Sequence, residues 1–301
     1  KTELRAPAPA LRTRIMSGQL RTIKNRIRSV ESTKKITRAM EMVSAAKLKR
    51  FQKVLDQAAP YTTALEGLLG RLIEAKTPFR HPLLTPRPEK KRALMVVTSD
   101  TDLCGSFNMD LVDEATRFLG TLPETPVLVG FGKSGVNALG RMGLTCHTVF
   151  KDTKTADLEH AVKKTGLLLE TLFREHKVDA VYVTYPRFMT KASFKAVTEK
   201  LLPLTLEAEN AAVSSVEYIF EPGAEFLFTK LVPMIFEAKV RELFMGSFVA
   251  EQTARMNAMH QATKNAGELI ESLTLTRNKI RQAAITKELI EIVSGSKAAK
   301  Q

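Results

Sequence analysis

The sequence predicts an α/β central domain flanked by two long terminal helices that pair as an antiparallel two-helix coiled coil. Two observations predict this arrangement: both ends carry long segments with apolar residues at helical spacing, and the middle alternates apolar runs with amphipathic segments. A composition of 44% hydrophobic and 26% charged residues is typical of a folded protein. No run approaches the ~18 consecutive apolar residues of a membrane span.

The first long helix is predicted from the segment Ser17–Gln57, which has no proline and one glycine. Ser17 is a suitable N-cap, so regular structure is expected to begin at Met16 or Ser17. Its apolar stripe begins with Leu20, Ile23, Ile27 and Val30. The stripe is then expected to shift in phase, as at a coiled-coil stutter, to Ile36, Met40 and Val43.

The second long helix follows Pro233, after which the chain has no proline. Its apolar positions alternate by three and four, with Thr263 and Arg277 as polar interruptions. The stripe consists of Met256, Met259, Thr263, Ala266, Ile270, Leu273, Arg277, Ile280 and Ala284, and then slips to Ile285, Leu289 and Ile292. With Pro233 in the first turn, a helix to Val293 is ~90 Å long and has to bury its stripe against another helix.

Between the helices, strand-like and helix-like segments alternate, which favours a doubly wound α/β domain. The expected strands are Ala93–Thr98, Pro126–Val129, Thr145–Phe150 and Val178–Thr184, and the expected helices lie near 108–119, 133–141 and 156–175. The predicted organisation is an N-terminal extension (1–15), a coiled-coil helix (16–77), a Pro-rich linker (78–91), the α/β domain (92–212), and a foot turn with the C-terminal helix (213–301).

Positive charge is concentrated near the N-terminus. The net charge is +14, and the first 57 residues hold 15 Lys/Arg against 4 Asp/Glu. This excess predicts an acidic partner, which could be nucleic acid, anionic lipid or an acidic protein surface. Residues 1–15 are basic and nearly free of acid, as in an organellar transit peptide or an expression remnant. Cys104 and Cys146 are too few for a disulfide framework or a zinc site, and they suit a reducing compartment.

One motif resembles a cofactor loop. Gly130-Phe-Gly132-Lys-Ser-Gly135 fits the dinucleotide pattern and is followed by Asp152, 17 residues after its last glycine. However, that fingerprint belongs to the first strand and helix of a domain, whereas here a whole unit precedes it. A phosphate-binding P-loop would need glycine at position 127, which is valine. Glycines that only permit a tight turn are therefore the favoured interpretation, and no cofactor is expected.

No catalytic or metal-binding group is predicted. A nucleophilic Cys104 would need a cation to lower its pKa, and the histidines, at 81, 147, 160, 176 and 260, are scattered without metal-ligand spacing. A small buried residue at a strand-to-helix turn is the favoured interpretation of Cys104.

Four segments, in this order along the chain, resemble signatures of the gamma subunits of rotary F-type ATP synthases. They are Ser32–Lys47 (STKKITRAMEMVSAAK), Ser99–Asn108 (SDTDLCGSFN), Arg255–Met259 (RMNAM) and Arg281–Gly295 (RQAAITKELIEIVSG). The resemblance covers about Met16 to Gly295. The second segment departs from the family pattern at Thr101, Asp102 and Ser106, where Arg, Gly and Gly are common. Pro233 has no usual counterpart.

The resemblance implies a non-catalytic rotor shaft that couples proton-driven rotation of the membrane c ring to conformational cycling of the catalytic beta subunits. The implied partners are the alpha and beta subunits, epsilon- or delta-type stalk subunits and the c ring, with no nucleic acid and membrane contact only through partners. The ending from Ile285 to Ile292 is most similar to mitochondrial and related bacterial members. The expected location is therefore the matrix side of the mitochondrial inner membrane, with the cytoplasmic side of a bacterial membrane as the alternative.

The family's contact positions map onto this chain by match. Contacts with beta subunits are implied for Met42, Arg255, Arg281, Gln282 and Thr286, and a foot near the c ring and an epsilon-type subunit is implied for Tyr218, Glu221 and Pro222. Two other hypotheses remain open from the residues alone. One is a coiled-coil nucleic-acid-binding protein that uses the basic helix, and the other is a dinucleotide-dependent enzyme that uses the loop Gly130–Gly135.

Overall fold

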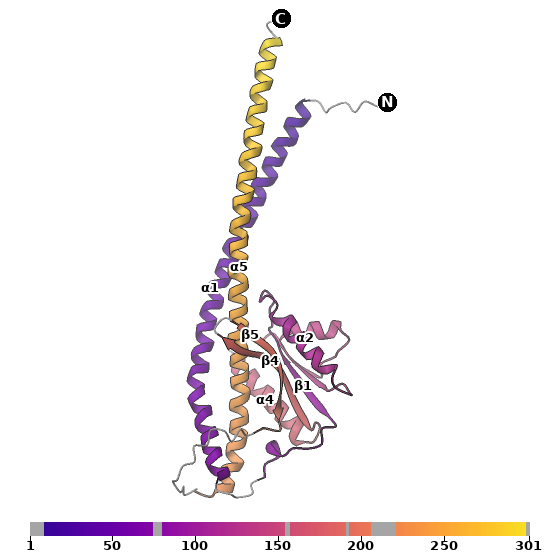
Figure 1. The fold of residues 1–301 in the computed structure, drawn as a ribbon, viewed down its shortest axis with the longest axis vertical. Helices are drawn as coiled ribbons and strands as arrows, with labels where there is room; N and C mark the ends of the chain where they lie inside the picture. Colours follow the sequence, from indigo (N-terminus) through magenta and orange to yellow (C-terminus); the bar gives the residue numbers. More distant parts are fainter. Residues whose placement is uncertain (1–8, 75–79, 154–156, 191–192, 206–220, 299–301) are drawn as a thin grey trace. The chain divides into compact units, whose positions relative to one another are not determined.

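The computed structural model describes residues 9–74, 80–153, 157–190, 193–205 and 221–298. The chain divides into two compact units. The first unit comprises residues 1–42 and 257–301, and the second comprises residues 43–256. Two long helices, α1 (Pro9–Glu74) and α5 (Ala224–Ala298), contribute to both units (Figure 1).

Both long helices begin earlier than expected. Helix α1 begins at Pro9 rather than at Met16 or Ser17, because proline is well tolerated at the first helical position. Helix α5 begins at Ala224, so Pro233 lies inside the helix and not in its first turn. An internal proline costs about 3 kcal/mol. Burial of Val232 and Ile235 beside it offsets that cost, since each buried aliphatic side chain contributes about 1.5–3 kcal/mol.

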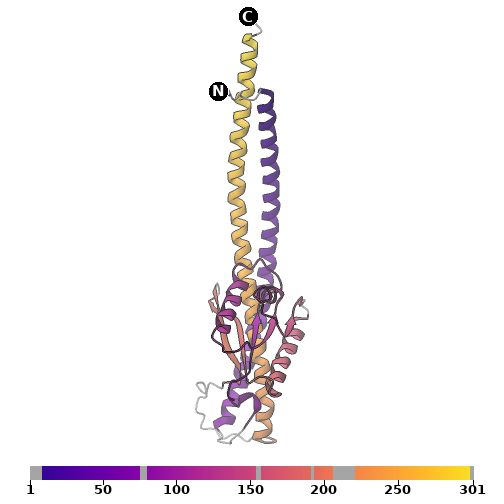
Figure 2. The ribbon, with the colours of Figure 1, turned by 90° about the vertical axis from the view of Figure 1, so that its right-hand side faces the viewer.

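In the first unit, α1 and α5 run side by side in opposite directions (Figure 2). The hydroxyl oxygens of Thr37 and Thr263 lie 2.8 Å apart across the seam. One turn away, His260 Nδ1 lies 2.9 Å from a carboxylate oxygen of Glu41. The predicted antiparallel coiled coil is confirmed. The α5 stripe is confirmed from Met256 to Ala284, where Met259, Thr263 and Ala266 are buried and the other members are half-buried. Its expected continuation through Ile285, Leu289 and Ile292 is wrong, because these three side chains are at least half exposed.

The predicted phase shift on α1 is wrong. Ile36 is 57% exposed and Val43 56% exposed, so these two residues lie outside the seam. The seam instead keeps its spacing of three and four through Lys34, Thr37 and Glu41. Helix geometry sets which positions face the partner, even where they are polar. Lys34 fits because it faces Gly267, where a Cβ would come within 3.2 Å of its Nζ.

The second unit is built on a five-stranded sheet in the order β3-β2-β1-β4-β5. Its strands are β1 (Arg92–Val97), β2 (Val127–Phe131), β3 (Thr148–Phe150), β4 (Ala180–Thr190) and β5 (Ser193–Leu202). The first four are parallel, as expected, and β5 pairs antiparallel with β4. Strand β5 was not predicted, although its alternating charged and apolar residues are typical of a half-exposed edge strand.

Helices cover both faces of the sheet, which confirms the doubly wound arrangement. Helices α2 (Phe107–Leu119) and α3 (Lys133–Arg141) pack on one face through a core that includes Leu94 and Val96. Helix α4 (Leu158–Arg174) lies on the opposite face (Figure 1). There it shares a core with Met95 and with the parts of α1 and α5 that belong to this unit. A short 3-10 turn, η1 (Pro82–Leu84), lies between α1 and β1.

Disulfide crosslinking can test whether Thr37 rather than Ile36 faces α5. The pair Thr37→Cys with Thr263→Cys is expected to form an intramolecular disulfide, because the two side chains meet in the seam. The matched pair Ile36→Cys with Thr263→Cys should not, since Ile36 faces outward. Peptide mass spectrometry identifies the crosslinked residues. A disulfide from position 36 but not from position 37 would contradict this seam and favour the predicted phase shift to Ile36.

Candidate functional site

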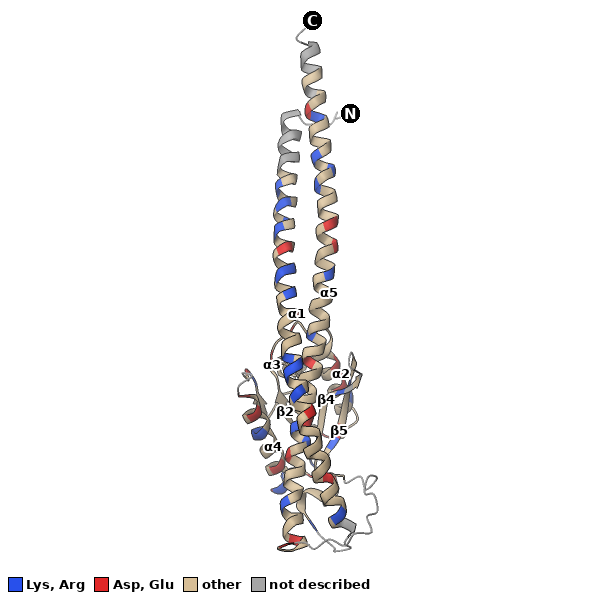
Figure 3. Ribbon diagram, turned by 90° about the vertical axis from the view of Figure 1, so that its left-hand side faces the viewer, with Lys and Arg blue, Asp and Glu red and all other residues tan. Residues whose placement is uncertain are grey.

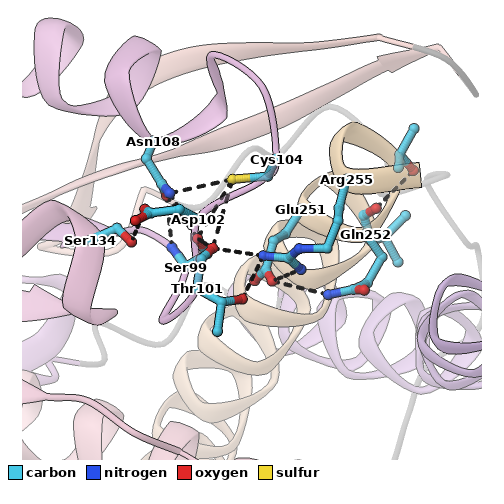
Figure 4. A network of polar contacts seen from close by, with 11 residues as sticks. Ser99, Thr101, Asp102, Cys104, Asn108, Ser134, Glu251, Gln252 and Arg255 are labelled. Atoms are coloured by element: carbon cyan, nitrogen blue, oxygen red, sulfur yellow. Dashed lines mark hydrogen bonds and ion pairs between the residues drawn. The ribbon is translucent and has the colours of Figure 1, made fainter. Parts of the chain in front are cut away.

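A polar network joins α5 to the loop that follows β1 (Figure 4). Arg255, on α5, is only 7% exposed. Its Nη2 group donates to the carbonyl oxygen and to the hydroxyl oxygen of Thr101, at 2.8 Å in each case. Its Nη1 group pairs with Glu251, one helical turn earlier. In the second unit, the guanidinium is therefore bound by the protein's own acceptors.

The three departures from the family pattern each have a partner in this chain. Thr101 accepts from Arg255. Asp102 accepts a hydrogen bond of 2.7 Å from the hydroxyl of Ser134. Ser106 donates to Asp110 at 2.9 Å. The substituted side chains thus hold the loop to α5, to α3 and to the start of α2.

Glu251, whose side chain is 13% exposed, is the acid of this network, and sequence reasoning missed it. Burial raises the pKa of its carboxyl group, and the Arg255 guanidinium opposes that rise. The only sequence signal was the spacing of four between Glu251 and Arg255, which places both on one helix face. This spacing is common on exposed helices, so the sequence alone does not distinguish a buried pair from a surface pair.

Cys104 lies in the same loop, as a buried residue, in agreement with its predicted role. Burial raises the pKa of its thiol, which disfavours the nucleophilic thiolate. Asn108 Nδ2 donates to the sulfur at 3.3 Å. The thiol therefore serves the packing of the turn.

The glycines of the loop Gly130–Gly135 are explained by close packing. Gly132 has φ +92°, and a Cβ there would lie 2.2 Å from the carbonyl oxygen of Thr98. A Cβ on Gly135 would collide with the Thr98 side chain, and one on Gly130 would lie 2.4 Å from Val136. The loop has to approach the end of β1 this closely, and only glycine permits it.

The N-terminus of α3 is occupied by the chain's own carboxylate. The backbone N–H of Lys133 donates to Asp100 Oδ1, and that of Thr153 donates to Asp100 Oδ2, both at 2.9 Å. The N–H of Ser134 donates to the carbonyl oxygen of Ser99. In a dinucleotide-binding loop a phosphate would accept such bonds. Asp152, the acid that follows the glycine motif, lies 3.9 Å from Lys133 Nζ.

Within the described residues, no cluster of three or more His, Cys, Asp or Glu side chains could hold a metal ion. Across the same ranges, no helix has the length and apolar character needed to span a membrane.

The expected beta-contact residues occupy different environments. Met42 is 58% exposed, and Arg281, Gln282 and Thr286 are all exposed, whereas Arg255 is buried. In the first unit, Glu41, the neighbour of Met42, meets His260 across the seam, and Arg281 lies roughly 30 Å further along α5 at about 1.5 Å per residue. Glu221 and Pro222 are exposed, and Tyr218 lies outside the described residues.

The change Arg255→Met tests the network. It removes the cation beside a buried carboxylate, so the free energy of unfolding should fall by about 3 kcal/mol. Burial raises the pKa of Glu251 in the folded state, so protonation of this carboxyl group stabilises the folded state relative to the unfolded state. This stabilisation is lost as the pH rises through the folded pKa. The loss should therefore be smaller below the ordinary pKa of glutamate than at neutral pH. Urea denaturation at both pH values measures it.

Two further variants control this experiment. Arg281→Met removes an exposed arginine and should change the stability by less than about 0.5 kcal/mol. The double change Arg255→Met with Glu251→Gln should recover part of the loss. Equal stability of Arg255→Met and Arg281→Met would contradict the assignment of a buried pair.

The packing role of the glycine loop makes a second prediction. Gly132→Ala should lower the free energy of unfolding by at least about 2 kcal/mol, because it adds both strain and a backbone clash. Gly140→Ala, inside α3 with no atom near its Cβ position, should instead raise it by about 0.5–1 kcal/mol. Urea denaturation measures the free energy of unfolding of both variants. An unchanged free energy in Gly132→Ala would refute the packing role of this glycine.

Comparisons with known proteins agree with this geometry. The sequence family described as ATP synthase matches residues 19–299. The ATP synthase gamma chain of Histophilus somni strain 129Pt is 37% identical over 286 residues, which cover 92% of this chain and 98% of that protein. The gamma chain of Pelotomaculum thermopropionicum is 36% identical over 279 residues, with coverage of 93% and 98%.

Two solved structures share the fold. One chain of the Euglena gracilis mitochondrial ATP synthase has a TM-score of 0.64 at 18% identity and covers 94% of this chain and 95% of that one. A chain from the central stalk and c ring of the Tetrahymena thermophila enzyme has a TM-score of 0.56 at 24% identity, covering 75% and 99%. The chain therefore belongs to the ATP synthase gamma chain family and is a non-catalytic rotor subunit of the central stalk.

Proposed function

We propose that this chain couples rotation of a membrane c ring, driven by protons, to conformational cycling of catalytic beta subunits. The observation that carries the proposal is the surface of α5 beyond its seam with α1. Five apolar residues there are at least half exposed: Ile285, Leu289, Ile290, Ile292 and Val293. Such a concentration of exposed apolar side chains is typical of a protein interface.

Polar groups of α5 accompany this apolar surface. Gln282 and Thr286 are one turn apart and share a face, and Arg281 projects ~100° away. All three side chains are exposed, so a cation, an amide and a hydroxyl are available to a partner. We assign them to a loop of one beta subunit. Met42, exposed on α1, is a further candidate contact.

The outer surface of α1 is basic, which favours a partner with an acidic surface. Lys and Arg residues follow one another along α1 in the first unit (Figure 3). Among residues 18–42, whose burial the structure describes, six of them are exposed: Arg21, Lys24, Arg26, Arg28, Lys35 and Arg38. An acidic protein surface would be attracted over the full turn of a rotor, because the charges lie on several sides of the helix. We infer that the alpha and beta subunits supply this surface.

Arg255, unlike the other proposed beta contacts, is buried and already has partners within the chain. Its donors are bound to Glu251 and to Thr101, so a contact with a beta subunit would require those bonds to be exchanged. We propose that a beta carboxylate competes with Glu251 for this arginine at some shaft angles. Coupling of this kind requires a contact that differs between two states.

The remaining partners follow from the named relatives. The Tetrahymena structure is described as central stalk and c ring, and one Euglena structure as OSCP, F1 and c ring. We propose a c ring and an epsilon- or delta-type subunit as partners here, with Glu221 and Pro222, both exposed, as contacts at the foot, together with Tyr218 from the sequence prediction.

For the location, we propose the matrix side of the mitochondrial inner membrane, with the cytoplasmic side of a bacterial membrane as the alternative. The basic composition of residues 1–15 and the mitochondrial fold relatives support the first. The 37% identity with bacterial gamma chains supports the second. Recovery of the protein from purified mitochondria or from bacterial membranes decides between them.

The double change Arg281→Ala with Gln282→Ala tests the contact with the beta subunit. A desolvated arginine–carboxylate contact contributes about 1.5–3 kcal/mol, so ATP turnover or assembly of the complex should fall about tenfold or more. The measurements are ATPase activity and subunit stoichiometry of the purified complex, together with circular dichroism of the variant chain.

Gln261→Ala with Lys264→Ala is the matched control, because it removes an exposed amide and an exposed cation elsewhere on α5. It should leave turnover near the wild-type value. Wild-type turnover and full assembly of the Arg281→Ala, Gln282→Ala complex would remove these residues from the mechanism. Loss of helicity would show that their role is structural.

A further inference from the structure

We propose that an open cavity in the second unit binds hydrophobic organic cations, independently of the rotor role. The cavity has a volume of about 640 Å³ and lies among helices α1, α4 and α5. Small-molecule sites typically measure about 300–1,000 Å³ and combine an apolar lining with a few polar groups. This cavity has both properties.

The apolar part of the cavity extends from a buried floor to an exposed mouth. Val162 and Phe236 are buried among its lining residues. Tyr61 and Leu167 also line it, and they are 52% and 62% exposed. Gly166 brings α4 close to α5, since a Cβ there would lie 3.4 Å from Val240. An apolar body can therefore be enclosed by side chains of all three helices.

The charged groups around the cavity favour a cation. Three glutamates line it, at 159, 170 and 237, against Lys163 and Arg241, with His160 counted as neutral. Arg241 is committed to Glu159 through two hydrogen bonds of 3.1 and 2.8 Å. The pair between Lys163 and Glu237 is longer, at 3.6 Å, and exposed.

The third acid, Glu170, leaves the lining with a net negative charge. Its side chain is 16% exposed, and it contacts Arg174 at 3.2 Å. Arg174 is 62% exposed and is not part of the lining, so the carboxylate of this pair borders the cavity and the guanidinium lies outside it. The cavity is thus a locally acidic site in a chain whose net charge is +14.

Tyr61 adds a second feature that selects cations. Its ring lies on the α1 side of the cavity, and more than half of the side chain is accessible to a ligand. An aromatic face attracts quaternary ammonium and phosphonium groups through its quadrupole. Apolar enclosure, excess acid and an aromatic wall together define the ligand class as a cation with an apolar body.

Titration with tetraphenylphosphonium and tetraphenylborate tests the proposal, because the two ions have nearly the same size and shape and opposite charge. Calorimetry on the full chain should give an affinity at least about tenfold higher for the cation. The chain's net positive charge would favour the anion at a nonspecific site. Equal affinities, tighter binding of the borate, or no binding of the phosphonium by the folded chain would overturn the proposal and leave this face to a protein partner.

Three variants locate the binding. Tyr61→Leu should weaken phosphonium binding about three- to fivefold, by loss of the aromatic face, and Glu170→Gln should weaken it by loss of charge. Leu275→Ala, which truncates a leucine that is 71% exposed in the first unit, is the control and should leave the affinity unchanged. Circular dichroism verifies that each variant is folded. Unchanged affinity in both cavity variants would place the ion elsewhere and refute the assignment.

Discussion

The requirement that two very long helices bury one continuous face is the constraint on which the structure depends. Helices of 66 and 75 residues cannot be stabilised by backbone hydrogen bonds alone. In the first unit each helix closes the seam of the other, and in the second unit both add to the core on one face of the sheet. The heptad spacing on α1 continues without a break from the seam of the first unit to the core of the second. Polar residues such as Lys34 and Thr37 occupy some of its positions.

The second unit uses an α/β fold in which the chain's own groups occupy the carboxyl ends of the strands. In open α/β sheets, ligands bind beyond the carboxyl ends of the parallel strands. Here that edge is filled from within the chain, because Thr98 packs against the glycine loop, Asp100 caps α3 and Thr101 holds Arg255. The loops at this edge, where a cofactor binds in other α/β proteins, hold the sheet against α5.

The gamma chain role requires a surface that partners can contact and a core that transmits force. We propose that the exposed apolar residues near the end of α5 and the exposed cations of α1 meet the first requirement. We propose that the pair of Glu251 and Arg255 meets the second as long as the arginine stays bound to Glu251, since breaking the pair without a replacement carboxylate would leave an uncompensated charge. Both features lie on the same two helices.

The sequence by itself determined the order and type of most elements, the family, and the nature of the glycine loop as a turn, because periodicity and local motifs are encoded by neighbouring residues. Only the tertiary structure decided that Ile36 faces outward, that α5 extends through Pro233 to Ala224, and that Arg255 is buried against Thr101. Strand β5 and the acid Glu251 were likewise found only there. The physical reason is that burial depends on what packs opposite a residue: Gly267 makes room for Lys34, and a loop more than 150 residues away supplies the acceptors for Arg255.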